Sequence, residues 1–242
     1  MQTDDRKVLA FAAIVCVTCS VLLSGAAASL KSRQEYNVEL DRKTNVLKAF
    51  GVAVVDENGK KVLTGADVDR YFSENISEIV LDASSGTVLE GVTSADLTKD
   101  DVKLKTKLPL YLWEEEGQIE KYAFPVSGKG LWSTIYGYIA LERDLGTIVG
   151  ITFYRHGETP GLGGEVDQPW FQDNFKSKKL WADGDLLPFE VVKGGVDSKY
   201  PQGNDHAVDG ISGATITARG VETFLRSDMA AYNKYFNTIR GI

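Results

Sequence analysis

An uncharged, apolar segment near the N-terminus limits what this chain can be more than any other feature does. The segment VLAFAAIVCVTCSVLLSGAAASL, residues 8–30, contains no charged side chain. As an α-helix it would be about 34 Å long, enough to cross the hydrocarbon core of a bilayer. A signal peptide is the alternative, with the alanines at 26–28 as a small-residue cleavage site. The uncharged length exceeds that of a short signal core, so we expect an uncleaved membrane helix.

The charges beside this segment do not fix its orientation. Arg6 and Lys7 precede it, whereas Lys31 and Arg33 follow it closely. The excess of positive charge on the cytoplasmic side is a weak guide when a large domain follows the helix. The charge pattern therefore leaves both orientations open.

The remainder of the chain is acidic and free of cysteine. The protein has 242 residues and a net charge of −7, and its two cysteines, Cys16 and Cys19, lie inside the apolar segment. The part that follows is long enough for one domain with its own core, and it cannot be held by disulfides. An acidic balance also disfavours binding to nucleic acid through its phosphates.

Residues 31–51 mix charged and apolar side chains in a pattern typical of a helix that continues out of the membrane. Leu40, Val46, Leu47 and Phe50 supply the apolar side, and Gly51 ends the pattern. We therefore divide the chain into residues 1–7, a membrane helix over 8–30, a linking helix over 31–51 and a folded domain over 52–242.

Strand patterns in the middle of the chain predict two β-hairpins. Residues 108–113 and 119–126 flank the turn EEEGQ, and residues 135–142 and 146–154 flank the turn RDLG. A short helical pattern over 66–71 precedes them. The soluble part is therefore expected to be one α+β domain with an antiparallel sheet.

A long helix is predicted at the C-terminus, because apolar side chains recur there every three or four residues. The residues in this pattern are Val221, Phe224, Leu225, Met229, Tyr232, Tyr235 and Phe236. Thr215 and Thr217 precede the pattern, and a threonine oxygen commonly caps the first amides of a helix. We expect the helix to begin near Thr217, with Thr217 as the N-cap.

The residues before this helix are unusually small. In the stretch DGISGATITARG, residues 209–220, Gly210, Gly213 and Ala214 leave the backbone open. A helix N-terminus with an open approach also suits a phosphate group, because its first amides and its dipole favour negative charge. The stretch is therefore a candidate phosphate site as well as a helix start.

Two more glycine-rich segments follow predicted strands, SGKGLWSTIYG at 127–137 and HGETPGLGGEVDQPWF at 156–171. The first is not a Walker loop, because Lys129 is not followed by Ser or Thr, which disfavours a nucleotide triphosphatase. In the second, Pro160 stiffens the backbone and three glycines free it, which suits main-chain amides held against a flat ligand. The spacing alone favours a tight loop ahead of a helix.

A metal site is not expected. His156 and Glu158 are two residues apart, but His206, the other histidine, comes with no ligand spacing. Two candidate ligands are too few for a metal centre.

Several of these segments resemble a known family. DGISGAT resembles a flavinylation motif in which the terminal threonine, here Thr215, carries FMN covalently. HGETPGLGGEV, GKGLWSTIYGYIAL and LDRKTNVLKAFG resemble segments of the C subunits of sodium-translocating NADH:quinone oxidoreductases, and together they cover most of the chain in the family's order. The G subunits of Rnf complexes share the flavinylation motif and the ETPGLG loop and are the alternative. GLGGEV, KGLWS and LDRKTNVLKA look more like the C subunits.

The resemblance implies an electron carrier with FMN joined through its phosphate to Thr215. The carrier would belong to a six-subunit respiratory complex that passes electrons from NADH to quinone while sodium is exported, and it would not bind NADH itself. A separate flavin transferase would attach the FMN, so no catalytic residue is expected on this chain. The resemblance also implies a bacterial inner membrane, with the N-terminus in the cytoplasm and the domain in the periplasm. An anchored envelope domain that binds a partner protein without a flavin is the alternative from another class.

The flavin surroundings are carried over from the matched segments. Asp209 would help to present the threonine hydroxyl or a metal ion during attachment. Trp132 is a further candidate for lining the ring, although it fits a core position equally well, and Lys193 could place a cation near the flavin or be a solvated lysine at a strand end. The expected walls are Glu158, Thr159, Leu162 and Gly163 from the loop, and Ser212, Gly213, Ala214, Ile216 and Thr217 beside the attachment point.

Overall fold

The computed structural model describes residues 2–54, 56, 60–182 and 185–241. Its internal contacts divide the chain into two compact units, residues 1–42 and 43–242. The first unit consists of most of one long helix. The second unit is the folded domain, and it includes the last two turns of that helix.

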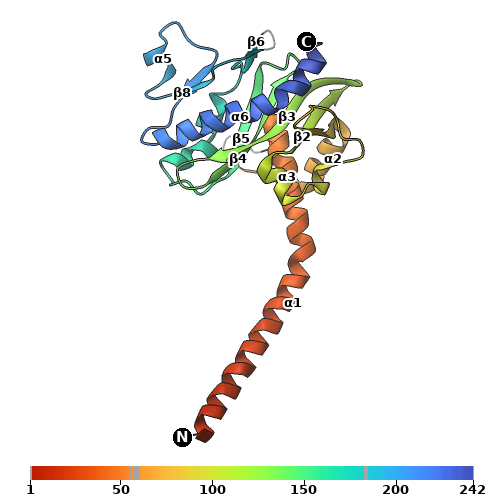
Figure 1. The fold of residues 1–242 in the computed structure, drawn as a ribbon, viewed down its shortest axis with the longest axis vertical. Coiled ribbons are helices and arrows are strands. Elements are labelled where there is room, and N and C mark those ends of the chain that lie inside the picture. The colour runs from red at the N-terminus through yellow and green to blue at the C-terminus, as the bar shows by residue number, and fades with distance from the viewer. Residues whose placement is uncertain (1, 55, 57–59, 183–184, 242) are drawn as a thin grey trace. The chain divides into compact units, whose positions relative to one another are not determined.

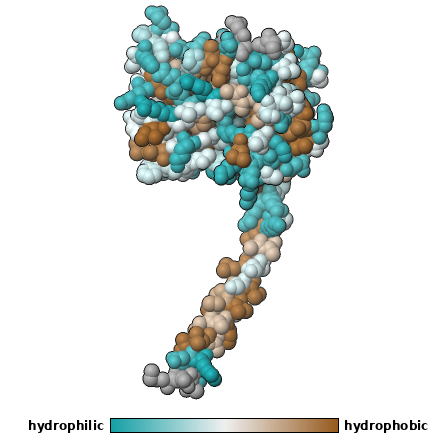
Figure 2. Space-filling view, viewed as in Figure 1, coloured by the Kyte–Doolittle hydropathy of each residue, from teal (hydrophilic) through white to brown (hydrophobic). Residues whose placement is uncertain are grey.

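The first helix, α1 (Gln2–Ala49), runs without interruption through both predicted helical segments. Its side chains from Asp5 to Leu30 are exposed, and residues 5–49 are one candidate membrane span by length and composition. Figure 2 shows the apolar residues in the middle of this helix, with polar ones toward both of its ends. The helix ends close to the predicted position, because Gly51 has a φ of +87° that continues no α-helix.

The domain is built on a five-stranded antiparallel sheet in which each strand pairs with the next along the chain. Both predicted hairpins are confirmed, and the first strand of the sheet is an element that the sequence patterns did not indicate. The strands are β1 (Ile76–Asp82), β2 (Lys107–Glu115), β3 (Gln118–Lys129), β4 (Thr134–Glu142) and β5 (Ile148–Arg155).

One face of the sheet is covered by the C-terminal helix α6 (Thr215–Arg240), which lies across the strands in Figure 1. Alternate residues of a strand point to the same face, so Phe124 and its neighbours at two-residue spacing form an apolar surface there. The ring centroids of Phe124 and Tyr232 are 4.2 Å apart, and Phe236 lies 5.9 Å from Phe124. The predicted apolar side of the helix is thus the main contact with the sheet.

Helix α6 approaches β3 closely at its N-terminal half, and glycine makes this approach possible. A Cβ atom on Gly220 would lie 2.3 Å from the carbonyl oxygen of Lys129, and one on Gly128 would lie 2.2 Å from Cβ of Phe224. Both distances are far inside van der Waals contact. The glycines therefore set the depth at which the beginning of α6 sits on the sheet.

The opposite face of the sheet holds the end of α1 and the helix α2 (Gly65–Asn75). Thr152 donates a hydrogen bond to the carbonyl oxygen of Asn45 at 3.5 Å, and the ring centroids of Phe72 and Tyr111 are 6.1 Å apart. The domain therefore has three layers, helix on sheet on helix, and is α+β as predicted.

Short elements complete the domain. Thr98 begins one of them as an N-cap, accepting a hydrogen bond from the amide of Asp101 at 3.1 Å. Among the strands that the structure describes, β8 and β9 are the pair that runs parallel. The short elements are η1 (Ser94–Asp96), α3 (Lys99–Leu104), η2 (Gly163–Asp167), α4 (Pro169–Asp173), β6 (Trp181–Ala182), β7 (Asp185–Leu186), β8 (Glu190–Val192), α5 (Val196–Lys199) and β9 (Ala207–Asp209).

Candidate functional site

The N-terminus of α6 differs from the sequence prediction. The helix begins at Thr215, its N-cap residue is Ala214, and this cap contributes no side-chain hydrogen bond. The prediction that Thr217 is the N-cap is wrong, because Thr217 is the third residue of the helix and is only 1% exposed. The first amides of a 26-residue helix thus lack the side-chain acceptor that usually caps them.

The Thr217 hydroxyl is used instead to hold a buried carboxylate. Its Oγ1 donates a hydrogen bond to Oε2 of Glu158 at 2.7 Å. The same carboxylate accepts three backbone bonds from the segment after β3, from the amides of Leu131 at 3.1 Å, Trp132 at 2.9 Å and Ser133 at 3.0 Å. Glu158 is 5% exposed, so these four donors replace the water that the carboxylate loses on folding.

The hydrogen bonds keep this buried carboxylate ionised. Burial raises the pKa of Glu158, but the bonds from Thr217 and from the three amides lower it by more, so the net pKa lies below its ordinary value. Glu158 therefore carries a negative charge at neutral pH. The charge is shared among donors from two separate parts of the chain.

Two glycines leave room for this network. A Cβ atom on Gly163 would lie 2.6 Å from Oγ1 of Thr217 and 2.9 Å from Oε2 of Glu158. One on Gly130 would lie 2.6 Å from Oε1 of Glu158. The glycine-rich segments around residues 130 and 163 are thus packed against the carboxylate, and their glycines are needed for a steric reason.

Thr215 lies on the other side of the helix start. Successive helical residues are rotated by about 100°, so Thr215 and Thr217 point in nearly opposite directions. Thr215 is half-buried, and in the described part of the chain no group forms a hydrogen bond with its side chain. Its hydroxyl is therefore available beside the uncapped amides of α6.

Apolar side chains surround this end of the helix without being buried. Ile216 is 59% exposed, Leu162 is 44% exposed and Trp132 is 67% exposed. Leu162 comes close to the loop before the helix, because a Cβ on Gly213 would lie 2.9 Å from its Cδ2 atom. The alternative that Trp132 belongs to the core is wrong, since its side chain projects into solvent.

The remaining residues of the matched segments occupy the loops around this end of the helix. Thr159 is exposed, and its carbonyl oxygen accepts hydrogen bonds from the amides of Leu162 and Gly164, which closes a tight turn. Ser212 is exposed and Gly213 has a φ of +73°, a backbone conformation that favours glycine. Ala214 is buried against the core.

Asp209 and Lys193 lie at the ends of the two paired strands β9 and β8. Asp209 ends β9 opposite Val192 of β8, and its Oδ1 accepts a hydrogen bond from the amide of Val196 at 2.6 Å. Lys193 follows β8 directly and is exposed. Its position is that of a solvated lysine at the end of β8. The neighbouring strand, β9, leads to Thr215.

The histidine of the loop has a local partner. Nε2 of His156 lies 3.1 Å from Oδ2 of Asp167, and Nδ1 accepts a hydrogen bond from the amide of Glu158 at 3.2 Å. In residues 2–54, 56, 60–182 and 185–241 no group of three or more histidine, cysteine, aspartate or glutamate side chains could hold a metal ion.

The sequence patterns did not identify Gly130, Leu131 and Ser133 as parts of the site. Their contributions are backbone amides and the space left by a missing side chain, and neither depends on a recognisable side-chain type. The available signal was the glycine-rich character of the segment after β3. No pattern in the sequence indicates the partner of that segment, which is Glu158.

The geometry suits a phosphate group joined to Thr215. A phosphate ester there would face helix amides that have no side-chain cap, where the helix dipole favours negative charge. Exposed apolar groups on Trp132, Leu162 and Ile216 offer surface to an attached flat ring. The residues present therefore fit a flavin nucleotide attached through its phosphate.

Comparison with known proteins agrees with this geometry. Residues 130–227, which contain the Glu158 network and Thr215, match the family described as FMN-binding domain. The chain is 36% identical to the C subunit of the Na(+)-translocating NADH-quinone reductase of Vibrio alginolyticus, over 90% of this chain and 87% of that protein. It is 37% identical to the corresponding protein of Pseudomonas aeruginosa, over 93% of this chain and 91% of that protein.

Solved structures give the same result. The crystal structure of Shewanella oneidensis NqrC superposes with a TM-score of 0.70 at 29% identity, over 84% of this chain and 97% of that one. The crystal structure of the corresponding protein from Parabacteroides distasonis gives a TM-score of 0.71 at 31% identity, over 85% and 96%. Sequence relationship over nearly the whole length, shared fold and a matching domain family together establish that this chain belongs to the C subunits of Na(+)-translocating NADH-quinone reductases.

Proposed function

We propose that this chain is a membrane-anchored electron carrier whose FMN is joined through its phosphate to Thr215. The observation that carries the proposal is the free hydroxyl of Thr215 at the uncapped N-terminus of α6, inside the sequence DGISGAT. The chain would act as one subunit of a complex that couples electron transfer from NADH to quinone with sodium export. No NADH site is expected on this chain.

Attachment makes one bond and breaks one. The oxygen of Thr215 would form an ester bond to the phosphorus of the FMN moiety of FAD, the bond to the AMP phosphate would break, and the hydroxyl proton would pass to a base. A threonine hydroxyl is a weak nucleophile at neutral pH, so a separate flavin transferase would supply the activation. Gly213 has no side chain and Ser212 is exposed, which leaves the approach to Thr215 open to such an enzyme.

The protein's own part is to position the attached group. The phosphodiester would keep one negative charge, which the amides and dipole at the start of α6 would stabilise by roughly 0.3–1 kcal/mol at an exposed site. Leu162, Ile216 and Trp132 would contact the ring system with their exposed apolar surfaces. The flavin supplies the electron chemistry, and the protein supplies position and electrostatics.

Glu158 would act as a positioning residue and not as a wall of the flavin site. All its strong hydrogen bonds go to protein donors, and it is nearly inaccessible to solvent. By fixing Thr217 and the segment 131–133 it would hold the helix start and Trp132 in one arrangement. Asp209 and Lys193 lie farther along the strand pair β8 and β9, where they would affect presentation of the loop before Thr215.

Substitution of the attachment residue tests the proposal. After co-expression with a flavin transferase, the native chain should give a yellow band that fluoresces under ultraviolet light on a denaturing gel. Thr215→Val should abolish the band while the domain stays folded. Mass spectrometry of the tryptic peptide 200–219 should show the FMN mass in the native chain, and the same mass in the Thr215→Val peptide would refute the assignment.

The orientation in the membrane is part of the proposal. Residues 8–30 would span the bacterial inner membrane with the N-terminus in the cytoplasm and the domain in the periplasm. In that compartment a lost flavin has no pool from which to rebind, which gives covalent attachment a reason. A reporter that is active only outside the cytoplasm should work when fused after Ile242, and activity of a cytoplasmic reporter alone would overturn this orientation.

A further inference from the structure

A second site candidate lies away from Thr215, in an open cleft of about 640 Å³. Its walls come from α3 with the two residues before it, the end of β3, the start of β4 and the end of β5. The lining includes Thr98, Lys99, Lys103, Lys105, Tyr136 and Arg155. Four of the lining residues are cationic and none is acidic, although the whole chain carries a net charge of −7.

The cleft exists because the sheet is incomplete at this point. β2 pairs with β3 only as far as Tyr111 opposite Ala123, whereas β3 continues beside β4 to Lys129. The unpaired edge of β3 is satisfied by side chains: the carbonyl oxygen of Ser127 accepts a hydrogen bond from Nζ of Lys105 at 2.7 Å, and its amide donates one to Asp228 at 2.8 Å. Lys105 also pairs with Asp228, so its charge is already compensated.

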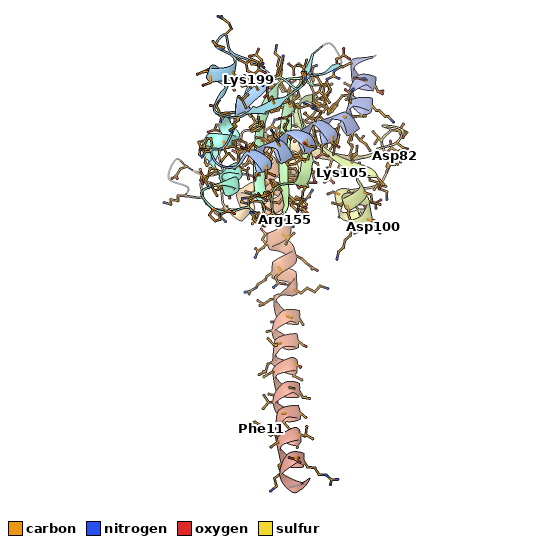
Figure 3. All side chains as sticks on the ribbon, turned by 60° about the vertical axis from the view of Figure 1, so that its left-hand side comes forward. Phe11, Asp82, Asp100, Lys105, Arg155 and Lys199 are labelled. Carbon is orange, nitrogen blue, oxygen red and sulfur yellow. The ribbon has the colours of Figure 1, made fainter. Side chains whose placement is uncertain are left out.

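Three other cations in the cleft have no such compensation. Within the described residues, no carboxylate forms an ion pair with Lys99, Lys103 or Arg155. Arg155 lies over the ring of Tyr136 with its guanidinium carbon 3.9 Å from the ring centroid, which fixes its direction without neutralising it. The two acids of α3 are outside the lining of the cleft: Asp101 is bonded to Thr98, and Asp100, which Figure 3 labels, is exposed.

Two of these cations lie close together in sequence. Lys99 and Lys103 are four residues apart on α3, and like charges at this spacing destabilise a helix. Arg155 adds a third positive charge from the other wall of the same cleft. A ligand with negative charge would remove the repulsion, and a planar guanidinium together with two ammonium groups is a donor set that suits the oxygens of a phosphate.

Contacts between β5 and the end of α1 show where Arg155 lies within the domain. A Cβ on Gly150 of β5 would lie 2.8 Å from the carbonyl oxygen of Ala49, and Thr152 is bonded to Asn45. The contacts of β5 with α1 therefore run from Ala49 back to Asn45 as β5 continues towards Arg155. Arg155 thus lies on the side of the domain where the chain enters it at residue 43.

We propose that this cleft binds a phosphate group, carried either by an anionic phospholipid headgroup or by a free phosphate compound. The volume is within the range of small-molecule sites, about 300–1,000 Å³. The inference is independent of the attachment of FMN to Thr215.

Calorimetric titration of the full chain in a neutral maltoside detergent tests this, at low ionic strength so that the charges are not screened. The titrants are dihexanoyl phosphatidylglycerol, dihexanoyl phosphatidylcholine and inorganic phosphate. We expect the two anionic titrants, phosphatidylglycerol and inorganic phosphate, to bind better than zwitterionic phosphatidylcholine, and equal binding of all three would overturn the site. Each cation removed should weaken binding about fivefold, so Lys99→Gln with Lys103→Gln should lower the affinity about 25-fold and Arg155→Gln about fivefold.

The matched control is Lys60→Gln with Lys61→Gln, which removes two exposed lysines outside the cleft. This pair should stay within twofold of the native affinity. Stronger binding of phosphatidylglycerol than of inorganic phosphate would assign a lipid headgroup to the site, and binding of inorganic phosphate that is at least as strong would assign a free phosphate compound. Binding of none of the titrants, or an equal loss in the control pair, would overturn the site and favour an acidic segment of a neighbouring subunit as the occupant.

The two proposals fail separately. All variants should retain the FMN mass on peptide 200–219, because the cleft and Thr215 do not share a residue. Absence of phosphate or lipid binding with FMN retained would concern the cleft alone, and absence of FMN in the native chain would concern the proposed function alone.

Discussion

The hydrogen bond between Thr217 and Glu158 can be removed with little change of shape, by the substitution Thr217→Val. The carboxylate would then keep three of its donors and lose the one at 2.7 Å. Thr217 and Glu158 are 1% and 5% exposed, so water does not easily replace the missing donor. A hydrogen bond to a charged group contributes about 1.5–3 kcal/mol, and we expect the free energy of unfolding to fall by about 2 kcal/mol.

Tryptophan fluorescence during thermal unfolding is a suitable assay, because all four tryptophans, Trp113, Trp132, Trp170 and Trp181, lie in residues 43–242. A change of 1 kcal/mol moves the midpoint of a domain of this size by about 2–4 °C, so we expect a decrease of about 4–8 °C. The measurement is made on the full chain in neutral detergent at pH 7.

The pH dependence provides a second readout of the same bond. The pKa of Glu158 is below its ordinary value near 4.5, because the hydrogen bonds outweigh the effect of burial. A carboxyl group with a lowered pKa stabilises the fold above its unfolded pKa, and this contribution is lost as the pH falls through the folded pKa. The native chain should therefore exceed Thr217→Val in free energy of unfolding by the whole amount at neutral pH. This difference should become smaller as the pH falls below 4.5.

Two controls separate the bond from its surroundings. Thr217→Ser keeps the hydroxyl and should lose less than half as much stability as Thr217→Val. Thr223→Val makes the same chemical change at an exposed position of α6, where the hydroxyl bonds only to the carbonyl oxygen of Arg219, and should have little effect. Covalent FMN should persist in all three variants. A midpoint for Thr217→Val within 1 °C of the native value would refute the role assigned to Thr217.

Three further outcomes are expected. Lys105→Met should lower the free energy of unfolding by about 2–3 kcal/mol at pH 7, because it leaves the Asp228 carboxylate buried without its cation. Burial already raises the pKa of Asp228, so this loss of stability should become smaller as the pH falls and Asp228 takes up a proton. A loss that does not depend on pH in chemical unfolding would contradict this. Gly220→Ala should lower the midpoint of thermal unfolding, although alanine favours helices, because its Cβ would lie 2.3 Å from the carbonyl oxygen of Lys129. A raised midpoint would show that α6 can shift. Deletion of residues 1–30 should leave a soluble domain, and aggregation without cooperative unfolding would show that the segment belongs to the fold.

Local patterns predicted the parts of the fold that depend on neighbours in sequence. The two hairpins and the apolar side of α6 were found because a strand and a helix repeat their apolar residues with different periods. β1 was not found, since it pairs with β2 across a long connection and follows α2 without a break. The parallel pair β8 and β9 was missed for a similar reason, because its two short strands are joined through α5 and carry no periodic pattern of their own.

In the candidate site, too, local patterns indicated some features and not others. The matched motif indicated Thr215, and its free hydroxyl fits that indication. The helix start was misplaced by two residues, because a threonine before an apolar run is usually a cap and nothing local shows that Thr217 already has another acceptor. That acceptor, Glu158, is 59 residues away in sequence. No local pattern in the sequence indicates a pairing over such a separation.

The Glu158 carboxylate also gives a physical reason why three separate motifs occur together in this chain. It is carried by the segment HGETPGLG, it accepts hydrogen bonds from the backbone of KGLWS, and it is bonded to the first turn of α6 directly after DGISGAT. Loss of the Thr217 hydroxyl or displacement of the backbone at 131–133 would leave part of a buried charge without donors, and a side chain at Gly130 or Gly163 would place a Cβ within 3 Å of that charge. The motif that presents Thr215 therefore depends on two loops that do not contain it, because they hold the turn of helix against which its phosphate would lie.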